Sequence, residues 1–463
     1  MLRTLATTTL TFLSAIVRAD DPPRREPALD AEPATAWAWT SENHLRYTWV
    51  LPAGIKAAEH RNLIIICHGT GLDYRWGSAN YKPGRFRPED IVVSVDGPSK
   101  ADDGSRLFLG NEHDAEAFGD FIVEVSKAFH SDRVYLYGHS QGSFFVCYFL
   151  GQHPELADGV VAHASGVWTW TLYNAEVAAV PLVFMHGTGD PVVPYGQSVG
   201  GRDWYREQGH RMVQLRRMPG YNHWPNGDRA SECLDWCIGM RTDDPARALA
   251  AAEAMLKIKN ADEYGFEMAP WFSGAREVFK RFEGTGPRPF DAPALEKAGV
   301  KERAADLIAR IESAGAAQVA KLREQIKSRA DLKLDGRPWV GHLMAVREDF
   351  RGVQSVEAFV KELGYDELVK EQTAAARDFL MVWFDRRTAA EKFGAATKAL
   401  PDCFLLDTLP GGMASQLETW FKSAEENNLG QDAGRSFAPV AQWRSAMQEG
   451  LTEYRAVWKG WKP

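Results

Sequence analysis

The chain has 463 residues, 45% hydrophobic and 25% charged, so it is long enough for two or three globular domains. Its formal net charge of -8 argues against binding to nucleic acid or to an anionic membrane surface. Five cysteines are too few for a disulfide scaffold. No cluster of His, Cys and Asp has the spacing of a metal site, so we expect no metal and no other cofactor.

The amino terminus has the pattern of a signal peptide. Arg3 precedes a mildly apolar run at 5–17, which is shorter than the ~20 residues that span a bilayer. Ala19 then offers a small residue at a cleavage point. We predict a signal peptide over 1–19, a polar lead-in over 20–35, and a secreted or periplasmic mature chain without a transmembrane segment. The alternative is a frayed or buried first helix.

Residues 36–241 alternate strand-like and helix-like patterns. A β-hairpin is expected over 36–51, and the clearest helices are expected over 114–129 and 143–152. Apolar strands that alternate with helices indicate an α/β fold with a mostly parallel sheet covered on both faces. The predicted strands of this sheet lie at 63–67, 91–95, 134–137, 160–164, 182–185 and 212–216.

Residues 242–463 have a different character. Strand-like runs disappear, and Ala, Glu, Lys, Arg and Leu at spacings of three and four predict a second, all-helical C-terminal domain. Cys233 and Cys237 lie four residues apart on the predicted closing helix of the first domain, where they either pack or form a bridge. One long helix of the second domain is expected to present an apolar stripe of Ala304, Leu307, Ile308, Ile311, Val319, Leu322 and Ile326.

The most informative segment is Gly138-His139-Ser140-Gln141-Gly142. It follows a strand-like run at 133–137 and precedes an apolar, helix-like stretch at 143–150. Strand, G-x-S-x-G and helix in this order predict a tight turn that holds the serine at the carboxyl end of a sheet. Glycines flank the serine because a side chain there would collide with the neighbouring strand and helix. Ser140 is therefore the expected nucleophile.

A serine hydroxyl needs a histidine base and an orienting carboxylate. On such a sheet the partners follow in the chain order serine, acid, histidine, each after a later strand. Asp190 follows the fifth predicted strand, and His223 follows the sixth. Asp203 is a weaker candidate because it lies in the next predicted helix, and His210 is weaker because it precedes the last strand.

Other residues are expected to support this chemistry. The backbone N–H groups of Gln141, directly after the nucleophile, and Thr70, in the loop after the first apolar strand, are the predicted oxyanion donors. His139 and His186 are expected to pack or to form local hydrogen bonds. Four aromatic residues near strand ends either line a substrate pocket or form a satellite cluster under a loop: Trp168, Trp170, Tyr221 and Trp224.

Four short motifs carry a resemblance to a known fold: His68-Gly69-Thr70-Gly71, the serine motif at 138–142, His186-Gly187-Thr188-Gly189-Asp190 and Asn222-His223-Trp224-Pro225. With them, the segment 63–224 resembles the α/β-hydrolase superfamily. It is similar to the secreted esterases that include polyhydroxybutyrate depolymerases, feruloyl and acetyl-xylan esterases and dienelactone-hydrolase-like enzymes. The resemblance implies a sheet of α/β-hydrolase type over 36–241 and ester hydrolysis. The helical domain matches nothing in that group.

These observations favour a secreted serine esterase that forms an acyl-enzyme from a small-molecule or polymeric ester. One alternative is a serine peptidase of the same fold, in which the histidine must protonate a poorer leaving group. Another is a vestigial hydrolase that acts as a binding or scaffold protein through its helical domain. In the enzyme, that domain either covers the active site as a lid or docks to a partner.

Overall fold

A computed structural model of the chain describes residues 37–51, 61–81, 86–188, 190, 192–218, 221–257, 269–328, 339–368 and 370. The predicted signal peptide, the polar lead-in and all of the predicted helical domain beyond residue 370, with Cys403, lie outside these residues. They therefore stay predictions.

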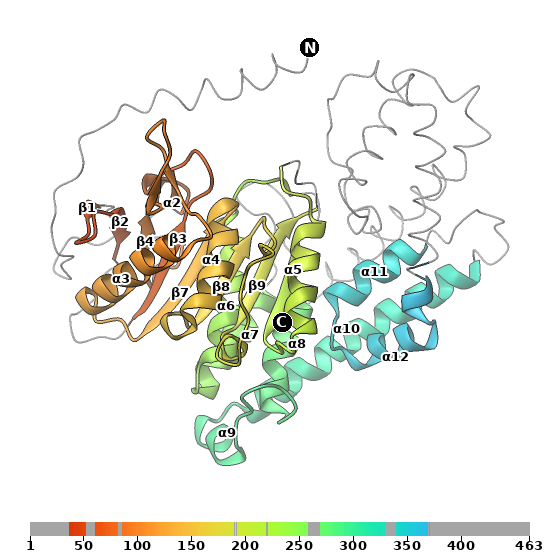
Figure 1. Cartoon of the computed structure of the whole chain (residues 1–463). Helices are drawn as coiled ribbons and strands as arrows, with labels where there is room; N and C mark the ends of the chain where they lie inside the picture. The colour runs from red at the N-terminus through yellow and green to blue at the C-terminus, as the bar shows by residue number, and fades with distance from the viewer. Residues whose placement is uncertain are drawn as a thin grey trace, which may run out of the picture.

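An eight-stranded sheet in the order β1-β2-β4-β3-β7-β8-β9-β10 forms the centre of the described chain (Figure 1). The six strands from β4 to β10 in this order run parallel, whereas β2 pairs antiparallel with β4 and with β1. The predicted hairpin and the six predicted strands are confirmed. Their bounds are Trp37–Thr40 (β1), Arg46–Val50 (β2), Asn62–Cys67 (β3), Ile91–Val95 (β4), Arg133–His139 (β7), Gly159–His163 (β8), Leu182–Gly187 (β9) and Val213–Met218 (β10).

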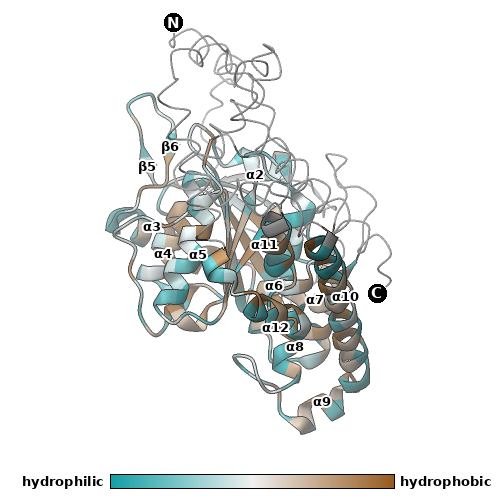
Figure 2. Ribbon diagram, turned by 90° about the vertical axis from the view of Figure 1, so that its right-hand side faces the viewer, coloured by the Kyte–Doolittle hydropathy of each residue, from teal (hydrophilic) through white to brown (hydrophobic). Residues whose placement is uncertain are grey.

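Alternate residues of the central strands enter two apolar clusters, one on each face of the sheet. In β3, Leu63 and Ile65 belong to one cluster, and Ile64 and Ile66 belong to the other. The first face is covered by α3 (Glu112–Ala128), α4 (Gln141–Gln152) and α5 (Gly196–Glu207). The second is covered by α2 (Arg75–Asn80), α6 (Gly227–Arg241), α7 (Pro245–Leu256) and α8 (Phe272–Phe282), and Figure 2 shows the two layers of larger helices on either side of the sheet. A short hairpin of β5 (Ser99–Lys100) and β6 (Arg106–Leu107) was not among the predicted elements.

The C-terminal region is helical over the described residues 242–257, 269–328 and 339–368, as the sequence predicts. Beyond α8 it contains α9 (Ala292–Ala298), α10 (Lys301–Ser328), α11 (Trp339–Asp349) and α12 (Gln354–Glu362). The predicted stripe of the long helix faces the core. Its buried members are Ala304, Leu307, Ile311, Val319 and Leu322, and Ile308 and Ile326 pack partly buried against the same cluster.

The cluster on the second face continues without a break from the sheet into the helical region. It joins Tyr135 of β7 to Trp236 of α6, Phe272 of α8 and Val356 of α12. The sheet and the described C-terminal helices therefore share apolar packing. The domain boundary predicted between residues 241 and 242 stays a prediction.

Two further findings concern the described residues. None of their helices is long and apolar enough to span a bilayer, and none of their His, Cys, Asp and Glu side chains gather in a group that could hold a metal ion. Cys233 and Cys237 are buried free thiols, and Cys237 Sγ lies 3.7 Å from the carbonyl oxygen of Val160. They pack within the core rather than form a bridge.

Candidate active site

Ser140 occupies a strained turn between β7 and α4. Its φ of 53° and ψ of -120° are rare for a residue with a side chain, and such conformations typically cost ~1–3 kcal/mol. The backbone N–H of Ser140 donates to the carbonyl of His163, 2.9 Å away, at the end of the neighbouring strand β8. The turn is thereby fixed at the carboxyl edge of the sheet.

The two flanking glycines are required by close backbone contacts. A Cβ on Gly138 would lie 2.5 Å from the carbonyl oxygen of Gly142, and a Cβ on Gly142 would lie 2.4 Å from that of His68. Such separations are far below van der Waals contact, so any side chain would push α4 away from β7 or β3. The physical reason for the G-x-S-x-G pattern is therefore visible in this chain.

Asp190 and His223 meet at the same edge because β9 and β10 are adjacent parallel strands. His223 Nδ1 lies 2.8 Å from Asp190 Oδ2, and the other carboxylate oxygen accepts the backbone N–H groups of Val192 and Val193 at 2.8 and 2.9 Å. Burial opposes ionisation of Asp190, but hydrogen bonds from His186 and His223 outweigh it and hold the pKa of the carboxyl well below its ordinary value. Asp190 is therefore an anion across the range in which an imidazole titrates.

His223 lies next to the serine turn. Its ring centroid is 4.9 Å from that of His139, the residue immediately before Ser140. Because Nδ1 faces the carboxylate, Nε2 is the nitrogen that can accept a proton. The structure thus brings Asp190 and His223 together at the edge of the sheet where Ser140 lies.

The two weaker candidates lie elsewhere. Asp203 is on α5, where its side chain is 47% exposed and pairs with Arg202. His210 is buried before β10, and its Nε2 lies 3.0 Å from the carbonyl oxygen of Val180, just before β9. The amino-terminal ends of these parallel strands form the edge opposite Ser140.

Two buried histidines pack behind His223. The Nδ1 atoms of His139 and His163 are 3.0 Å apart, and Trp76 stacks on His139 with a centroid separation of 4.8 Å. Burial, with a further contribution from His223, lowers the pKa of His139 to about 3, and burial also lowers the pKa of His163 well below its usual value. Both rings are neutral at pH 7, so neither disfavours a positive charge on His223.

The predicted oxyanion donors lie on segments that flank Ser140. A Cβ on Gly69 would lie 3.1 Å from Ser140 Cβ, so the loop after β3, which continues into the exposed Thr70, packs against the nucleophile. Gln141 is the first residue of α4, where a backbone N–H has no partner within the helix. The two N–H groups remain candidates for this role.

The aromatic residues divide into exposed and buried groups. Trp168 stacks between Phe144, one turn after Ser140, and Trp170, with centroid separations of 5.8 and 5.5 Å. Trp170 and Trp224 are about half exposed, whereas Tyr221 is 4% exposed and belongs to the core cluster. Tyr221 therefore faces the protein interior, and the role of all four as substrate-lining residues stays a prediction.

His186 packs and forms local hydrogen bonds, as the sequence predicts. Its Nε2 also lies 3.2 Å from Asp190 Oδ2, and both side chains are fully buried. The sequence analysis did not predict this partner. The spacing of four residues between His186 and Asp190 was the available signal.

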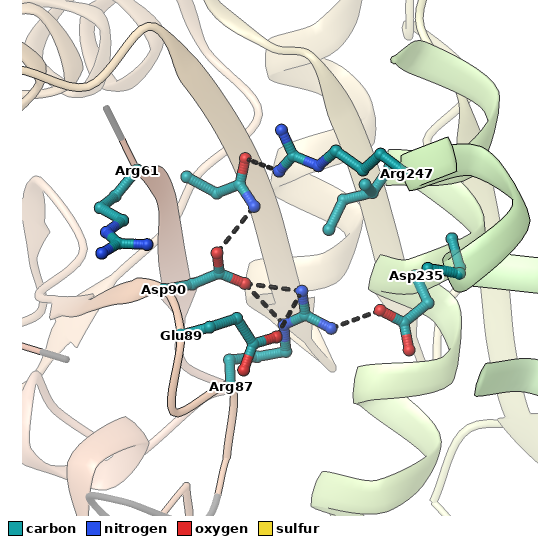
Figure 3. Close-up of a pocket in the computed structure, with 10 residues that line it drawn as sticks. Arg61, Arg87, Glu89, Asp90, Asp235 and Arg247 are labelled. Carbon is teal, nitrogen blue, oxygen red and sulfur yellow. Dashed lines mark hydrogen bonds and ion pairs between the residues drawn. The ribbon is translucent and has the colours of Figure 1, made fainter. Parts of the chain in front are cut away.

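A charged cavity of about 380 Å³ lies at the opposite edge of the sheet (Figure 3). It is lined by Asn62, the first residue of β3, and by Asp90, just before β4. Figure 3 shows Arg87 between Asp90 and Asp235, with both of which it forms ion pairs. Ligands of open α/β sheets bind at the carboxyl ends of the strands, whereas this cavity lies at the amino-terminal ends. The cavity, in which Arg87 pairs with Asp90 and Asp235, is therefore not the candidate active site.

Residues 112–230, which include Ser140, Asp190 and His223, match the family model described as Phospholipase/Carboxylesterase. The mostly parallel sheet with helices on both faces has an α/β-hydrolase-like arrangement, and we call this part of the chain the hydrolase domain. The match covers about a quarter of the chain, so the matched segment is similar to phospholipases and carboxylesterases. No curated protein matches the sequence significantly.

Solved structures similar to the hydrolase domain include several esterases. A carboxylesterase from Bacillus cereus is 18% identical, with 43% of this chain and 100% of that chain covered and a TM-score of 0.36. A carboxylesterase from Mesorhizobium loti is 19% identical, with 41% and 92% covered and a TM-score of 0.35. A thermostable esterase is 16% identical, with a TM-score of 0.32, and the similarity covers 41% of this chain and 54% of that one.

Proposed function

We propose that the chain is a serine esterase in which Ser140, His223 and Asp190 form the catalytic triad. The observation that carries the proposal is the 2.8 Å contact between His223 and the buried carboxylate of Asp190, at the edge of the sheet that holds Ser140 in a strained turn. A buried carboxylate of this kind orients the imidazole and stabilises the imidazolium that forms during catalysis.

The proposed reaction has two stages. Ser140 Oγ attacks the ester carbonyl while His223 Nε2 takes its proton, and the backbone N–H groups of Gln141 and Thr70 stabilise the oxyanion. The imidazolium then protonates the departing alkoxide, which leaves an acyl group on Ser140. A water molecule, deprotonated by His223, attacks this acyl-enzyme and releases the acid.

We further propose that the substrate is a small-molecule or polymeric ester of the kind that polyhydroxybutyrate depolymerase-like enzymes hydrolyse, and that the enzyme is secreted or periplasmic. The stacked and partly exposed rings of Trp168 and Trp170, with the exposed Trp224, support a substrate with apolar or aromatic groups. A panel of acetyl, butyryl, feruloyl and peptidyl substrates tests both the acyl preference and the peptidase alternative.

The nucleophile is tested by Ser140→Ala. Loss of the nucleophile in such triads costs on the order of 10⁶ in kcat, so ester turnover should fall to background. A fluorophosphonate probe should label the parent chain and not this variant. The matched control is Ser143→Ala, three residues along the same helix, which should still be labelled. Labelling of Ser140→Ala would place the nucleophile elsewhere.

A further inference from the structure

The Asp190 carboxylate has four hydrogen-bond donors around it. Oδ1 accepts the backbone N–H groups of Val192 and Val193, and Oδ2 lies between His223 Nδ1 at 2.8 Å and His186 Nε2 at 3.2 Å. A carboxylate offers about four lone-pair positions. The fourth donor, His186, therefore completes the hydrogen bonding of a fully buried anion.

His186 Nε2 lies near two acceptors, the carbonyl oxygen of Val193 at 2.9 Å and Asp190 Oδ2 at 3.2 Å. A carbonyl can only accept, so Nε2 carries the hydrogen, which these two acceptors share. On the other side of the ring, Nδ1 is 2.7 Å from Ser198 Oγ. Tyr195 packs against the ring edge-on with a centroid separation of 5.7 Å. These contacts leave the imidazole little freedom to rotate.

We propose that His186 is a positioning residue of the triad, which fixes the Asp190 carboxylate through the oxygen that Asp190 also presents to His223. The inference rests on the proposed function. Without His186, one lone pair of a buried carboxylate has no donor, so the carboxylate becomes more basic and can rotate away from His223. A more basic carboxylate holds a protonated His223 more strongly.

The other imidazoles that face this pair have lowered pKa values. They are His139 at the end of β7 and His163 at the end of β8. Burial lowers the pKa of His139 to about 3 and that of His163 well below its usual value. A shift of the acid limb in the variants is therefore assigned to His223 and its carboxylate rather than to these two rings.

The test compares His186→Leu with His186→Gln in the full chain. His186→Leu removes the N–H, so kcat on a small ester should fall roughly tenfold to a hundredfold with KM little changed. The acid limb of kcat/KM should move to higher pH, because the base holds its proton more strongly. The amide N–H of His186→Gln can replace the imidazole N–H, and it should restore most of kcat and the parental limb.

Two further variants keep the test decisive. Ser198→Ala removes the hydroxyl that contacts Nδ1 and that also donates to the carbonyl oxygen of Ser165, but it leaves the imidazole in place. It should fold even where His186→Leu does not, and it should move the acid limb in the same direction by a smaller amount. His210→Leu removes another buried imidazole at the opposite edge, and the acid limb should stay where it is. If neither His186→Leu nor Ser198→Ala moves the limb, the inference is wrong.

The two proposals fail separately. Activity that survives in Ser140→Ala would overturn the proposed function. Suppose instead that Ser140→Ala is inactive and that His186→Leu keeps the parental kcat and acid limb. That result would overturn only the role of His186.

Discussion

At the scale of single residues, the acid of the candidate triad combines burial with ionisation. Asp190 keeps its negative charge in a water-excluded position because two backbone N–H groups and two imidazoles surround it. The carboxylate sets which ring nitrogen of His223 carries the hydrogen, and hence which nitrogen can act as the base. A neutral amide at position 190 would keep the shape of the side chain, but it would no longer determine which nitrogen of His223 carries the hydrogen.

We therefore expect Asp190→Asn to retain the fold and to lower kcat by roughly 10⁴, the loss seen when the histidine takes the wrong tautomer. Ester turnover and a circular dichroism spectrum check the two parts of the prediction. Asp203→Asn is the control, because Asp203 is exposed on α5 and pairs with Arg202. A large loss of turnover in Asp203→Asn and a small loss in Asp190→Asn would show that the acid of the triad is Asp203 on α5.

At the scale of elements, helix α11 is tied to the hydrolase domain by buried ion pairs. Glu348 of α11 lies 2.8 Å from Arg202 of α5, and both side chains are less than a tenth exposed. Burial opposes ionisation of Glu348, but Arg202, Arg351 and Arg206 together hold the pKa of its carboxyl well below the ordinary value. Asp349, the next residue, lies 3.9 Å from Arg217 near the end of β10.

Removing one partner of a buried ion pair typically costs ~3–5 kcal/mol, because the other charge stays buried without compensation. We expect Glu348→Gln to lower the free energy of unfolding by an amount in this range, measured by denaturant melts. Replacement of both partners, Arg202→Met with Glu348→Leu, should recover much of the loss. Glu362→Gln is the control, because Glu362 forms an exposed pair with Arg323 and its loss should change little. Equal effects of Glu348→Gln and Glu362→Gln would contradict the prediction.

At the scale of the whole molecule, the apolar cluster on one face of the sheet runs into the C-terminal helices. We expect a chain that ends after Arg241 to expose the buried face of α6, including Trp236 and Met240, and to aggregate or bind a hydrophobic dye. A soluble monomer that ends at Arg241, with the near-ultraviolet spectrum of the full chain, would instead support the predicted domain boundary.

Acid stability is a second property of the whole molecule. His139, His163 and His210 are buried with lowered pKa values, about 3 for His139 and about 4 for His210. Below pH 6.5 the unfolded chain binds protons at these imidazoles that the folded chain does not, so stability falls as the pH falls from about 6.5 toward 4. Burial raises the pKa of Asp235 to about 6, so below that pH the folded chain binds one proton that the unfolded chain binds less readily. This single group therefore raises the stability as the pH falls.

We expect His210→Gln to flatten this dependence by roughly 1 kcal/mol per pH unit between about pH 6 and 4.5, the contribution of one buried neutral imidazole. Denaturant melts at pH 7, 6, 5 and 4.5 measure the slope. His130→Gln is the control, because His130 is exposed, and it should leave the slope unchanged. An identical slope in the parent and His210→Gln would mean that His210 ionises in the folded chain as it does in the unfolded one.

The sequence by itself determined the features that depend on local patterns. Apolar runs bounded by turn residues located the six parallel strands, and the stripe from Ala304 to Ile326 predicted the long helix, because periodicity follows from backbone geometry. The glycines around Ser140 predicted the strained turn, because only glycine fits such close backbone contacts. The same strand pattern selected Asp190 and His223, because each directly follows a predicted strand that comes after Ser140 in the chain.

Tertiary structure alone decided which distant side chains touch. The pairing of Glu348 with Arg202 across 146 residues depends on how α11 packs on α5, and no local pattern encodes that packing. The burial of Tyr221 in the core cluster likewise depends on how the loop after β10 packs on the rest of the fold. The same is true of His186, whose hydrogen bond to Asp190 arises only where the end of β9 and its loop close around the carboxylate. Periodicity fixes which face a residue occupies, but the contacts across that face are set by strand order and helix packing.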